Sequence, residues 1–302
     1  MPVIEVSGLH KRYGRHVAVE DVSFSVEEGE VFGVLGPNGA GKTTTVESVA
    51  GLRRRDGGTV SVLGLDPDRD RTDLRRALGI QLQAAQLPDR LRVAEAVELF
   101  ASFYPAPADG DELVERWGLG HKRDARFDQL SGGQRQRLSI VLALVGNPRV
   151  AILDELTTGL DPQARRDTWA AIEQVRDRGV TVVLVTHFME EAERLCDRVA
   201  VIDAGRVVAA GTPGELAGAG GQRLRFRPSA PFADAVLTDL AEVDAVQRRG
   251  AQVEVTGHGD LLLAVTTALA AARVVPADLR LERTTLDDAF VALTGHRAGA
   301  DS

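Results

Sequence analysis

The chain has 302 residues, of which 44% are hydrophobic, and a formal net charge of -8. This length gives room for one large or two unequal domains, and the acidic balance argues against non-specific nucleic-acid binding, which needs a basic surface. The single cysteine, Cys196, excludes an internal disulfide. No uncharged apolar run reaches the roughly 18 residues of a membrane span and no signal-peptide pattern opens the chain, so the sequence predicts a cytoplasmic protein.

The first fifty residues predict strands followed by a loop and a helix. Short alternating stretches predict antiparallel strands over residues 3–6, 17–19 and 22–26, with Tyr13 in the link between the first two. The apolar run 31–35 predicts a buried strand, and residues 43–50 predict a helix. Between them the stretch 36–44 fits the pattern G-x-x-x-x-G-K-[ST] in the strand, loop and helix context that this motif requires.

This stretch predicts a phosphate-binding loop. Its glycines allow a tight turn, so that backbone N–H groups and the positive end of the helix point at the phosphates of a nucleotide. Lys42 adds a positive charge and Thr43 a hydroxyl group for Mg2+. A Gly-rich turn without a ligand is the alternative, but lysine is scarce in this chain. We expect phosphate contacts from Gly36, Pro37, Asn38, Gly39, Ala40, Gly41, Lys42, Thr43 and Thr44.

A predominantly helical region follows. Strands are predicted over 58–63 and 79–83, a helix over 72–78, and a solvated turn at Arg53-Arg54-Arg55. Apolar residues then recur at helical spacing over 94–104, 111–117 and 133–145, which predicts a helical insert at about 87–147.

The third of these helices opens with Leu130-Ser131-Gly132-Gly133-Gln134. Ser131 suits a helix N-cap, and the two glycines allow backbone N–H groups to approach an anion closely. Ser131, Gly132, Gly133 and Gln134 are therefore predicted to form a second phosphate-recognition surface. A flexible helix cap is the alternative.

Strands then alternate with helices, which predicts an α/β fold with a parallel sheet. The apolar strand 149–155 ends in Asp154 and Glu155, ahead of a helix over 162–178 and a strand over 181–186. At the tip of a strand beside a phosphate loop, Asp154 can hold Mg2+ through water and Glu155 can polarise the attacking water. A solvated turn is the alternative.

The carboxy-terminal third predicts a second, smaller domain. Residues 211–221 are rich in Gly, Ala, Thr and Pro, which indicates a linker. Beyond it the predicted order is strand, helix (232–240), strand, strand, helix, strand, which is typical of a ferredoxin-like α+β domain, followed by a helix over 287–293. The expected organisation is a nucleotide-binding domain at 1–215, a linker at 216–221 and an accessory domain at 222–302.

In order and spacing, the phosphate loop, residues 130–134 and Asp154-Glu155 resemble the motifs of the ATP-binding cassette (ABC) ATPases, the nucleotide-binding subunits of transporters. Gly159-Leu160-Asp161 also fits, and the resemblance covers about residues 3–215. It implies that Tyr13 stacks on adenine, that Gln83 senses Mg2+ and the attacking water, and that His187 contacts the γ-phosphate. One departure is Leu156, because the family usually has proline there and leucine leaves the loop less stiff.

The same resemblance implies partners and a location. Two copies would pack head to tail, with each ATP between the phosphate loop of one copy and the Ser131 segment of the other, and with Asp161 communicating across the dimer. A separate membrane permease would dock at residues 84–93, facing Gln83, and would hold the chain on the inner face of the cell membrane. We expect no nucleic-acid partner, because the chain is acidic and carries neither a second cassette nor a long coiled-coil insert.

The stretch 285–295 is similar to the tail of the drug and antibiotic exporters of the daunorubicin-resistance type. We therefore expect an ATPase that drives export of a drug-like, antibiotic or lipid-like substrate. The alternatives are a soluble ABC ATPase acting on ribosomes or nucleic acid, and an ABC exporter of polysaccharide. A small-molecule kinase would have no use for residues 130–134, and a second domain that binds a ligand or dimerises would be compatible with transport.

Overall fold

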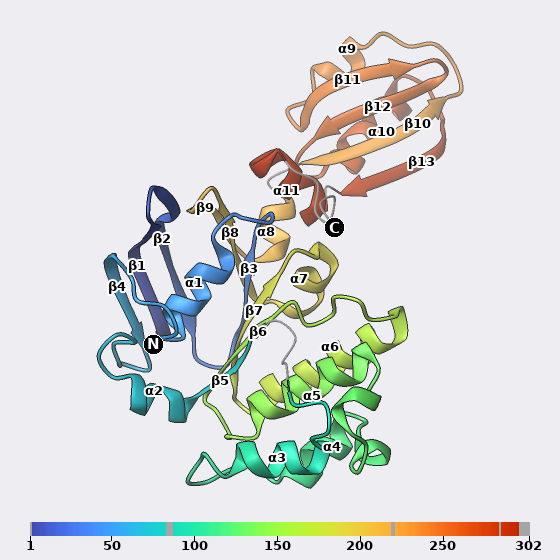
Figure 1. The fold of residues 1–302 in the computed structure, drawn as a ribbon. Helices are drawn as coiled ribbons and strands as arrows, with labels where there is room; N and C mark the ends of the chain where they lie inside the picture. Colours follow the sequence, from blue (N-terminus) through green and yellow to red (C-terminus); the bar gives the residue numbers. More distant parts are fainter. Residues whose placement is uncertain (1, 83–86, 219–220, 284, 296–302) are drawn as a thin grey trace. The chain divides into compact units, whose positions relative to one another are not determined.

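The computed structural model describes residues 2–82, 87–218, 221–283 and 285–295. The chain divides into two compact units, one running to Pro213 and the other from Gly214 to Gly295 (Figure 1). No helix in these described ranges has the length and hydropathy that a membrane span needs.

A nine-stranded sheet forms the first unit, with the order β4-β1-β2-β9-β8-β3-β7-β6-β5. Its strands β8, β3, β7, β6 and β5 are parallel, whereas β1, β2 and β4 are antiparallel, as expected for the amino-terminal strands. The strands are β1 (Pro2–Tyr13), β2 (His16–Glu27), β3 (Val31–Leu35), β4 (Gly57–Val62), β5 (Leu78–Gln81), β6 (Val150–Asp154), β7 (Thr181–Thr186), β8 (Arg198–Asp203) and β9 (Arg206–Gly211).

The amino-terminal hairpin is longer than the sequence predicted. Because β1 runs to Tyr13, this residue ends a strand instead of lying in a link, and it pairs with His16. The strand breaks expected from the alternation are bulges, where the register of β1 against β2 shifts.

The register of the parallel strands brings the ends of β3, β6 and β7, where the site was predicted, to one edge of the sheet. Every residue of β3, β6 and β7 is buried, as is usual for strands covered on both faces. Leu35 pairs with Thr186 and Asp154 pairs with Val185, so the three strands end at one edge. The loops that follow them therefore begin side by side, at the edge where ligands bind in α/β sheets.

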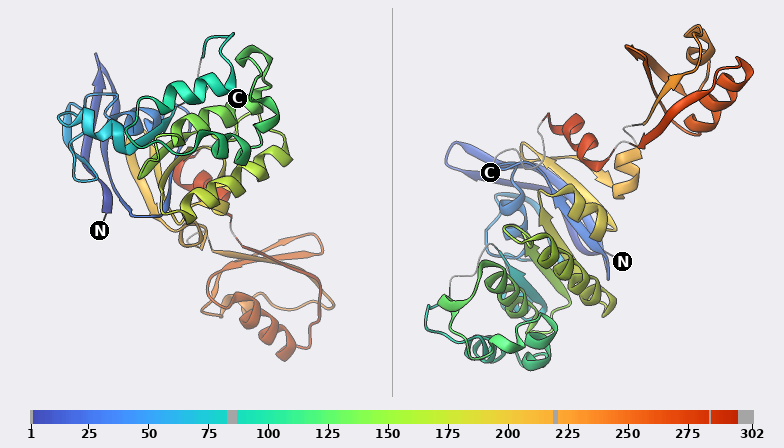
Figure 2. Two further views of the ribbon diagram at one scale, coloured as in Figure 1. Left: turned by 90° about the horizontal axis from the view of Figure 1, so that it is seen from below. Right: turned by 90° about the vertical axis from the view of Figure 1, so that its right-hand side faces the viewer.

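Seven helices of the first unit have these bounds: α1 (Lys42–Val49), α2 (Arg71–Ala77), α3 (Val93–Ala101), α4 (Gly110–Arg116), α5 (Gly132–Leu144), α6 (Pro162–Asp177) and α7 (Met189–Leu195). Helices α3, α4 and α5 pack on one another and form the green cluster in every view (Figure 2). They correspond to the three helices predicted between residues 94 and 145. Helix α3 ends before Tyr104 because that residue precedes Pro105, which disfavours helical backbone there.

The second unit is a four-stranded antiparallel sheet with helices. Its strands are β10 (Gln222–Pro228), β11 (Val243–Arg249), β12 (Gln252–Gly257) and β13 (Pro276–Arg283), in the order β11-β12-β10-β13. Side chains from β10 and β12 pack with α9 (Ala235–Thr238) and α10 (Leu261–Ala271) in one core. A last helix, α11 (Leu286–Thr294), follows.

Two predictions in this region differ from the structure. The expected linker contains a short helix, α8 (Pro213–Gly218), because proline is well suited to the first position of a helix. The helix predicted over 232–240 is only the four residues of α9, since Phe232 instead packs its ring 6.4 Å from that of Phe226.

Candidate nucleotide-binding and hydrolysis site

The phosphate loop connects β3 to α1, and its glycines are required by its surroundings. A Cβ atom at Gly36 would lie 2.2 Å from the carbonyl oxygen of Ile202, and one at Gly41 would lie 2.4 Å from that of Ala18. Gly41 also has a φ of 101°, in the left-handed region that favours glycine. The loop is therefore held against neighbouring backbone, and its path excludes side chains at these positions.

Lys42 fills the loop from inside. Its Nζ donates hydrogen bonds to the carbonyl oxygens of Gly36, at 2.8 Å, and Pro37, at 2.9 Å. Burial lowers the pKa of Lys42, while the charges of Asp154 and Glu155 oppose that shift. The ammonium group thus lies inside the loop that would surround a phosphate.

A cavity of about 490 Å³ adjoins the loop at the start of α1. The half-exposed ring of Tyr13 contributes to its wall, with Arg53 Cζ 5.8 Å from the ring centroid. Arg53 also pairs with Glu47, Nε to Oε2 at 2.6 Å. The lining residues are Tyr13, Thr43, Thr44, Glu47, Arg53 and Leu82.

Three of these lining residues were not predicted. Glu47 lies four positions after Thr43 on α1, so helical spacing could have placed it on the same face. Arg53 was assigned to a solvated turn, and its side chain is indeed half exposed there, but it also lines the cavity. Arg55 in the same run pairs instead with Asp66, through two hydrogen bonds of 2.9 and 2.8 Å.

Asp154 ends strand β6 as a buried carboxyl group, only 3% exposed. Burial, helped by the negative charge of Glu155, raises the pKa of Asp154 to about 6, while Lys42 opposes this shift. The described residues contain no cluster of three or more His, Cys, Asp or Glu side chains that would form a metal centre. Mg2+ at a nucleotide needs none, because one or two carboxylates together with phosphate oxygens suffice. Thr43 and Asp154 are the oxygen donors that fit this coordination.

Glu155 and His187 come together from adjacent strands. Glu155 has a φ of 50°, which is rare for a residue other than glycine, and its N–H donates to the carbonyl oxygen of Val185 at 2.9 Å. The turn leaves Oε1 of Glu155 3.5 Å from Nδ1 of His187. That nitrogen is buried, and within the described ranges it has no hydrogen-bond partner. A carboxylate and an imidazole thus lie at the edge where the phosphate loop begins.

The predicted Ser131 segment has the expected cap geometry. Ser131 precedes α5, its Oγ accepts from the N–H of Gln134 at 3.3 Å, and Oε1 of Gln134 accepts from the N–H of Ser131 at 3.0 Å. This reciprocal pair is a capping box. Ser131 and Gly132 are exposed, and Gly133 and Gln134 are partly so. The start of α5 is therefore open to an anion from outside.

Asp161 has a comparable position at the start of α6. Its Oδ1 accepts from the N–H groups of Gln163, at 3.0 Å, and Ala164, at 2.9 Å. Chiefly through the bond from Ala164, these contacts lower the pKa of Asp161. Gln83, which was predicted to complete the site, lies outside the described residues.

Known proteins match this chain over most of its length. A family model described as "ABC transporter" matches residues 19–158. A daunorubicin resistance ATP-binding protein of Streptomyces coeruleorubidus is 40% identical, over 97% of this chain and 96% of that protein. The chain belongs to the ATP-binding subunits of ABC transporters. As an ABC ATPase it binds nucleotide and hydrolyses ATP.

Other relatives of this ABC ATPase extend the comparison. A Nod factor export ATP-binding protein of Ralstonia nicotianae is 43% identical over 71% of the chain and 68% of its own length. A solved ATP-binding subunit of an ABC transporter superposes with a TM-score of 0.66, at 30% identity, over 71% of this chain and 91% of that one. A dimeric ATP-binding cassette in a post-hydrolysis state, bound to ADP and Pi, has a TM-score of 0.63 at 26% identity, over 69% and 98%.

Proposed function

We propose that this ABC ATPase drives export of a drug-like, antibiotic or lipid-like compound through a separate membrane permease. The observation that carries this proposal is the extent of its likeness to the daunorubicin-resistance proteins. Two of them align over 97% and 98% of the chain, and so include its second unit, whereas the Nod factor relative aligns over 71%. Exporters of polysaccharide would share the first unit and are the alternative substrate class.

Each site residue has a role in hydrolysis. The loop and Lys42 hold the phosphates, Tyr13 stacks on the base, and Thr43 and Asp154 hold Mg2+, which when bound neutralises charge on the β- and γ-phosphates. Glu155 orients the attacking water and accepts its proton at a carboxylate oxygen. His187 contacts the γ-phosphate, and Gln83 completes the water and Mg2+ site. The 3.5 Å approach of Glu155 to His187 supports this assignment.

The functional unit is a head-to-tail dimer of two copies. Its support is the exposure of Ser131 and Gly132 at a capped helix start, together with the dimeric assembly of a related cassette. ATP lies between the phosphate loop of one copy and residues 131–134 of the other, and Asp161 communicates across the interface. ATP binding closes the dimer and hydrolysis opens it, which gives a two-state motion that a permease can use.

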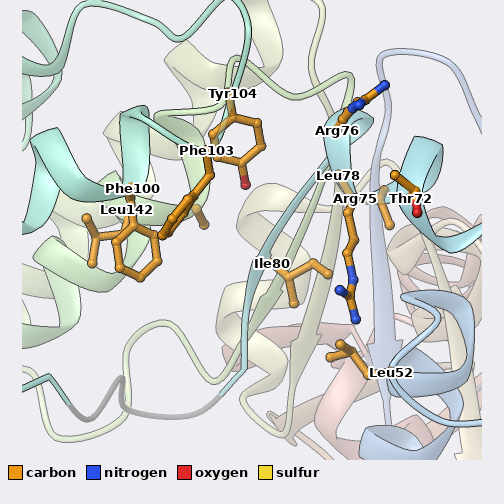
Figure 3. A pocket seen from close by; sticks show the side chains of 11 residues that line it. Leu52, Thr72, Arg75, Arg76, Leu78, Ile80, Phe100, Phe103, Tyr104 and Leu142 are labelled. Atoms are coloured by element: carbon orange, nitrogen blue, oxygen red, sulfur yellow. The ribbon is translucent and has the colours of Figure 1, made fainter.

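The permease docks over a cavity of about 590 Å³ (Figure 3). Phe100, Phe103 and Tyr104, which follow or end α3, lie on one side of it, and Leu52 and Arg75 lie on the other. Ile80 of β5, the strand that leads to Gln83, lies between them. Phe103 is 66% exposed, so an apolar helix of a partner would bury surface that water now covers. Residues 84–93, predicted to contact the permease, continue from this strand.

The chain contains an ABC cassette at about 1–215, a short connection at 216–221 and an accessory domain at 222–302. The accessory domain is ferredoxin-like. Its order of strands and helices and its sheet order β11-β12-β10-β13, with all neighbours antiparallel, support this classification.

Fractionation tests the proposed function. Co-expression with its natural permease is expected to move the chain to the membrane fraction of cells, and candidate export compounds are expected to stimulate ATP turnover of the copurified complex. Lys42→Ala is the control, since it should still reach the membrane but lose nucleotide binding and efflux. Co-sedimentation with ribosomes, and no recruitment by the permease, would instead favour a soluble ABC ATPase.

A further inference from the structure

A carboxyl group with no role in the proposed reaction is buried beside the hydrolysis site. Glu191 lies on α7, four residues after His187, and is 0% exposed. Burying a carboxyl group costs free energy unless hydrogen bonds satisfy it, and burial accordingly raises the pKa of Glu191. Its position therefore requires partners.

Polar side chains from three different segments surround this carboxyl group. Nε1 of Trp169, on α6, donates to Oε1 of Glu191 at 3.2 Å. The hydroxyl groups of Thr186, at the end of β7, and of Thr157, in the loop after β6, lie close enough to favour its charged form. Glu191 thus lies where these three segments meet.

The contact with Thr157 is not yet a full hydrogen bond. Oε2 of Glu191 and Oγ1 of Thr157 are both buried, and among the described residues neither has a hydrogen-bond partner. Two such neighbouring groups gain free energy when they approach, because each leaves a buried polar atom unsatisfied while they are apart. A hydrogen bond between these two groups would satisfy both of them.

The loop after β6 has little else in its sequence to restrain it, so a hydrogen bond from Thr157 to Glu191 would hold it in place. Sheet pairing ends where Asp154 meets Val185, and Glu155 already turns out of the strand. Leu156 follows, without the fixed φ that proline would give. Thr157 comes two residues after Glu155, and Thr186 immediately precedes His187.

We propose that Glu191 is a positioning residue for ATP hydrolysis, which holds Glu155 and His187 in register through its contacts with Thr157 and Thr186. This inference rests on the proposed function, in which Glu155 accepts the proton of the attacking water. Glu191 is fully buried, so it is not itself a candidate contact of the nucleotide. Its effect on the reaction is to restrict where the carboxylate of Glu155 can lie relative to the γ-phosphate.

The test separates positioning from simple stability with isosteric variants of the full chain. Thr157→Val removes the hydroxyl group at almost constant volume, and Glu191→Leu removes the carboxyl group. Both are expected to lower kcat for Mg-ATP about tenfold or more, because small misplacements of catalytic groups slow reactions strongly. The Kd for ATP should stay within about twofold, since the phosphate loop is untouched. Glu191→Gln and Thr157→Ser, which keep the hydrogen-bonding groups, should restore most of the turnover.

Trp169→Phe is the matched control, because it removes a hydrogen bond to the same carboxyl group without touching the loop. It should lower the urea midpoint of unfolding while kcat stays within about threefold. If Glu191→Leu does not fold, Thr157→Val decides the matter alone. Wild-type kcat in Thr157→Val, or equal losses of kcat in Thr157→Val and Trp169→Phe, would overturn the inference.

A further control keeps this inference distinct from the proposed function. If Glu155→Gln loses turnover while Thr157→Val keeps it, only the role of Glu191 is wrong. If Glu155→Gln itself keeps normal turnover, the assignment of the base fails, and the positioning role fails with it.

Discussion

The site residues fall into two groups that differ in burial. At the strand edge, Lys42 and Asp154 are 7% and 3% exposed, and their electrostatic surroundings come from this chain. At the helix starts, Ser131 and Asp161 are exposed and make local capping contacts. The comparison teaches that the residues proposed for hydrolysis are held within one chain, whereas the proposed second phosphate-recognition surface is open to solvent.

The largest expected effect comes from the strand-edge group. Glu155→Gln should lower ATP turnover about 1,000-fold, in the range that removal of a general base produces, because the amide cannot accept the proton of water. Nucleotide affinity should change little, and the loaded protein should accumulate as a dimer. Turnover assays and size-exclusion chromatography with Mg-ATP measure these effects. A fully active variant would contradict the role of Glu155.

The pH dependence of stability tests whether Asp154 is buried as described. The folded-state pKa of Asp154, about 6, lies above its ordinary value of 3.8, so the folded chain binds this proton more tightly than the unfolded chain. Protonation therefore stabilises the fold fully below pH 3.8, and this stabilisation is lost as the pH rises through about 6. The shift corresponds to about 3 kcal/mol.

Asp154→Asn removes this titration, which isolates its contribution. In EDTA, the variant should gain up to about 3 kcal/mol of unfolding free energy over the wild type between pH 4 and pH 7. Urea unfolding at several pH values measures the difference. Asp124→Asn is the control, because the side chain of Asp124 is 88% exposed. Its unfolding free energy should vary with pH as that of the wild type does. If the unfolding free energy of Asp154→Asn also varied with pH as that of the wild type does, the carboxyl group of Asp154 would be solvated.

The exposed residues at the helix starts can be changed without altering the buried residues at the strand edge. A Cβ atom at Gly132 would meet no heavy atom within 4 Å, so Gly132→Glu fits the monomer. Its negative charge would face the phosphates of a nucleotide bound to a second copy, at a cost of about 2 kcal/mol, and turnover should fall about thirtyfold. ATP affinity of the monomer should not change, and Gly132→Ala should remain active. Normal turnover in Gly132→Glu would argue against a shared site.

The sequence predicted where the strand-edge residues lie, because each motif follows a continuous apolar run. The runs at residues 31–35 and 150–153 specify buried strands, and parallel pairing brings their carboxyl ends together. Contacts between distant segments could not be read in the same way. Glu191 carries no motif, and its burial against Trp169 depends on how α6 and α7 pack.

The wall of the cavity beside the phosphate loop combines predicted and unpredicted residues. Tyr13 could be proposed from the family resemblance, but its strand extends further than the alternation indicated because bulges absorb the irregular register. Arg53 was missed because a run of three arginines is ordinarily solvated, and only the tertiary fold brings this one to Tyr13.

Substitution of Tyr13 has the smallest predicted effect. This residue lies neither at the strand edge nor at a helix start. Tyr13 is 39% exposed and lines the same cavity as Thr43, so in the proposed role its ring would offer a flat apolar face to a base. Tyr13→Ala should weaken ATP binding about tenfold, the loss expected for one stacking contact, and should weaken GTP binding to a similar degree. Tyr13→Phe should bind like the wild type, because stacking needs the ring and not the hydroxyl group. A ring that only stacks on the base affects binding and leaves the reacting phosphate in place. If Tyr13→Ala lowered kcat while the Kd for ATP stayed constant, the ring would instead act on the hydrolysis step, like the residues at the strand edge.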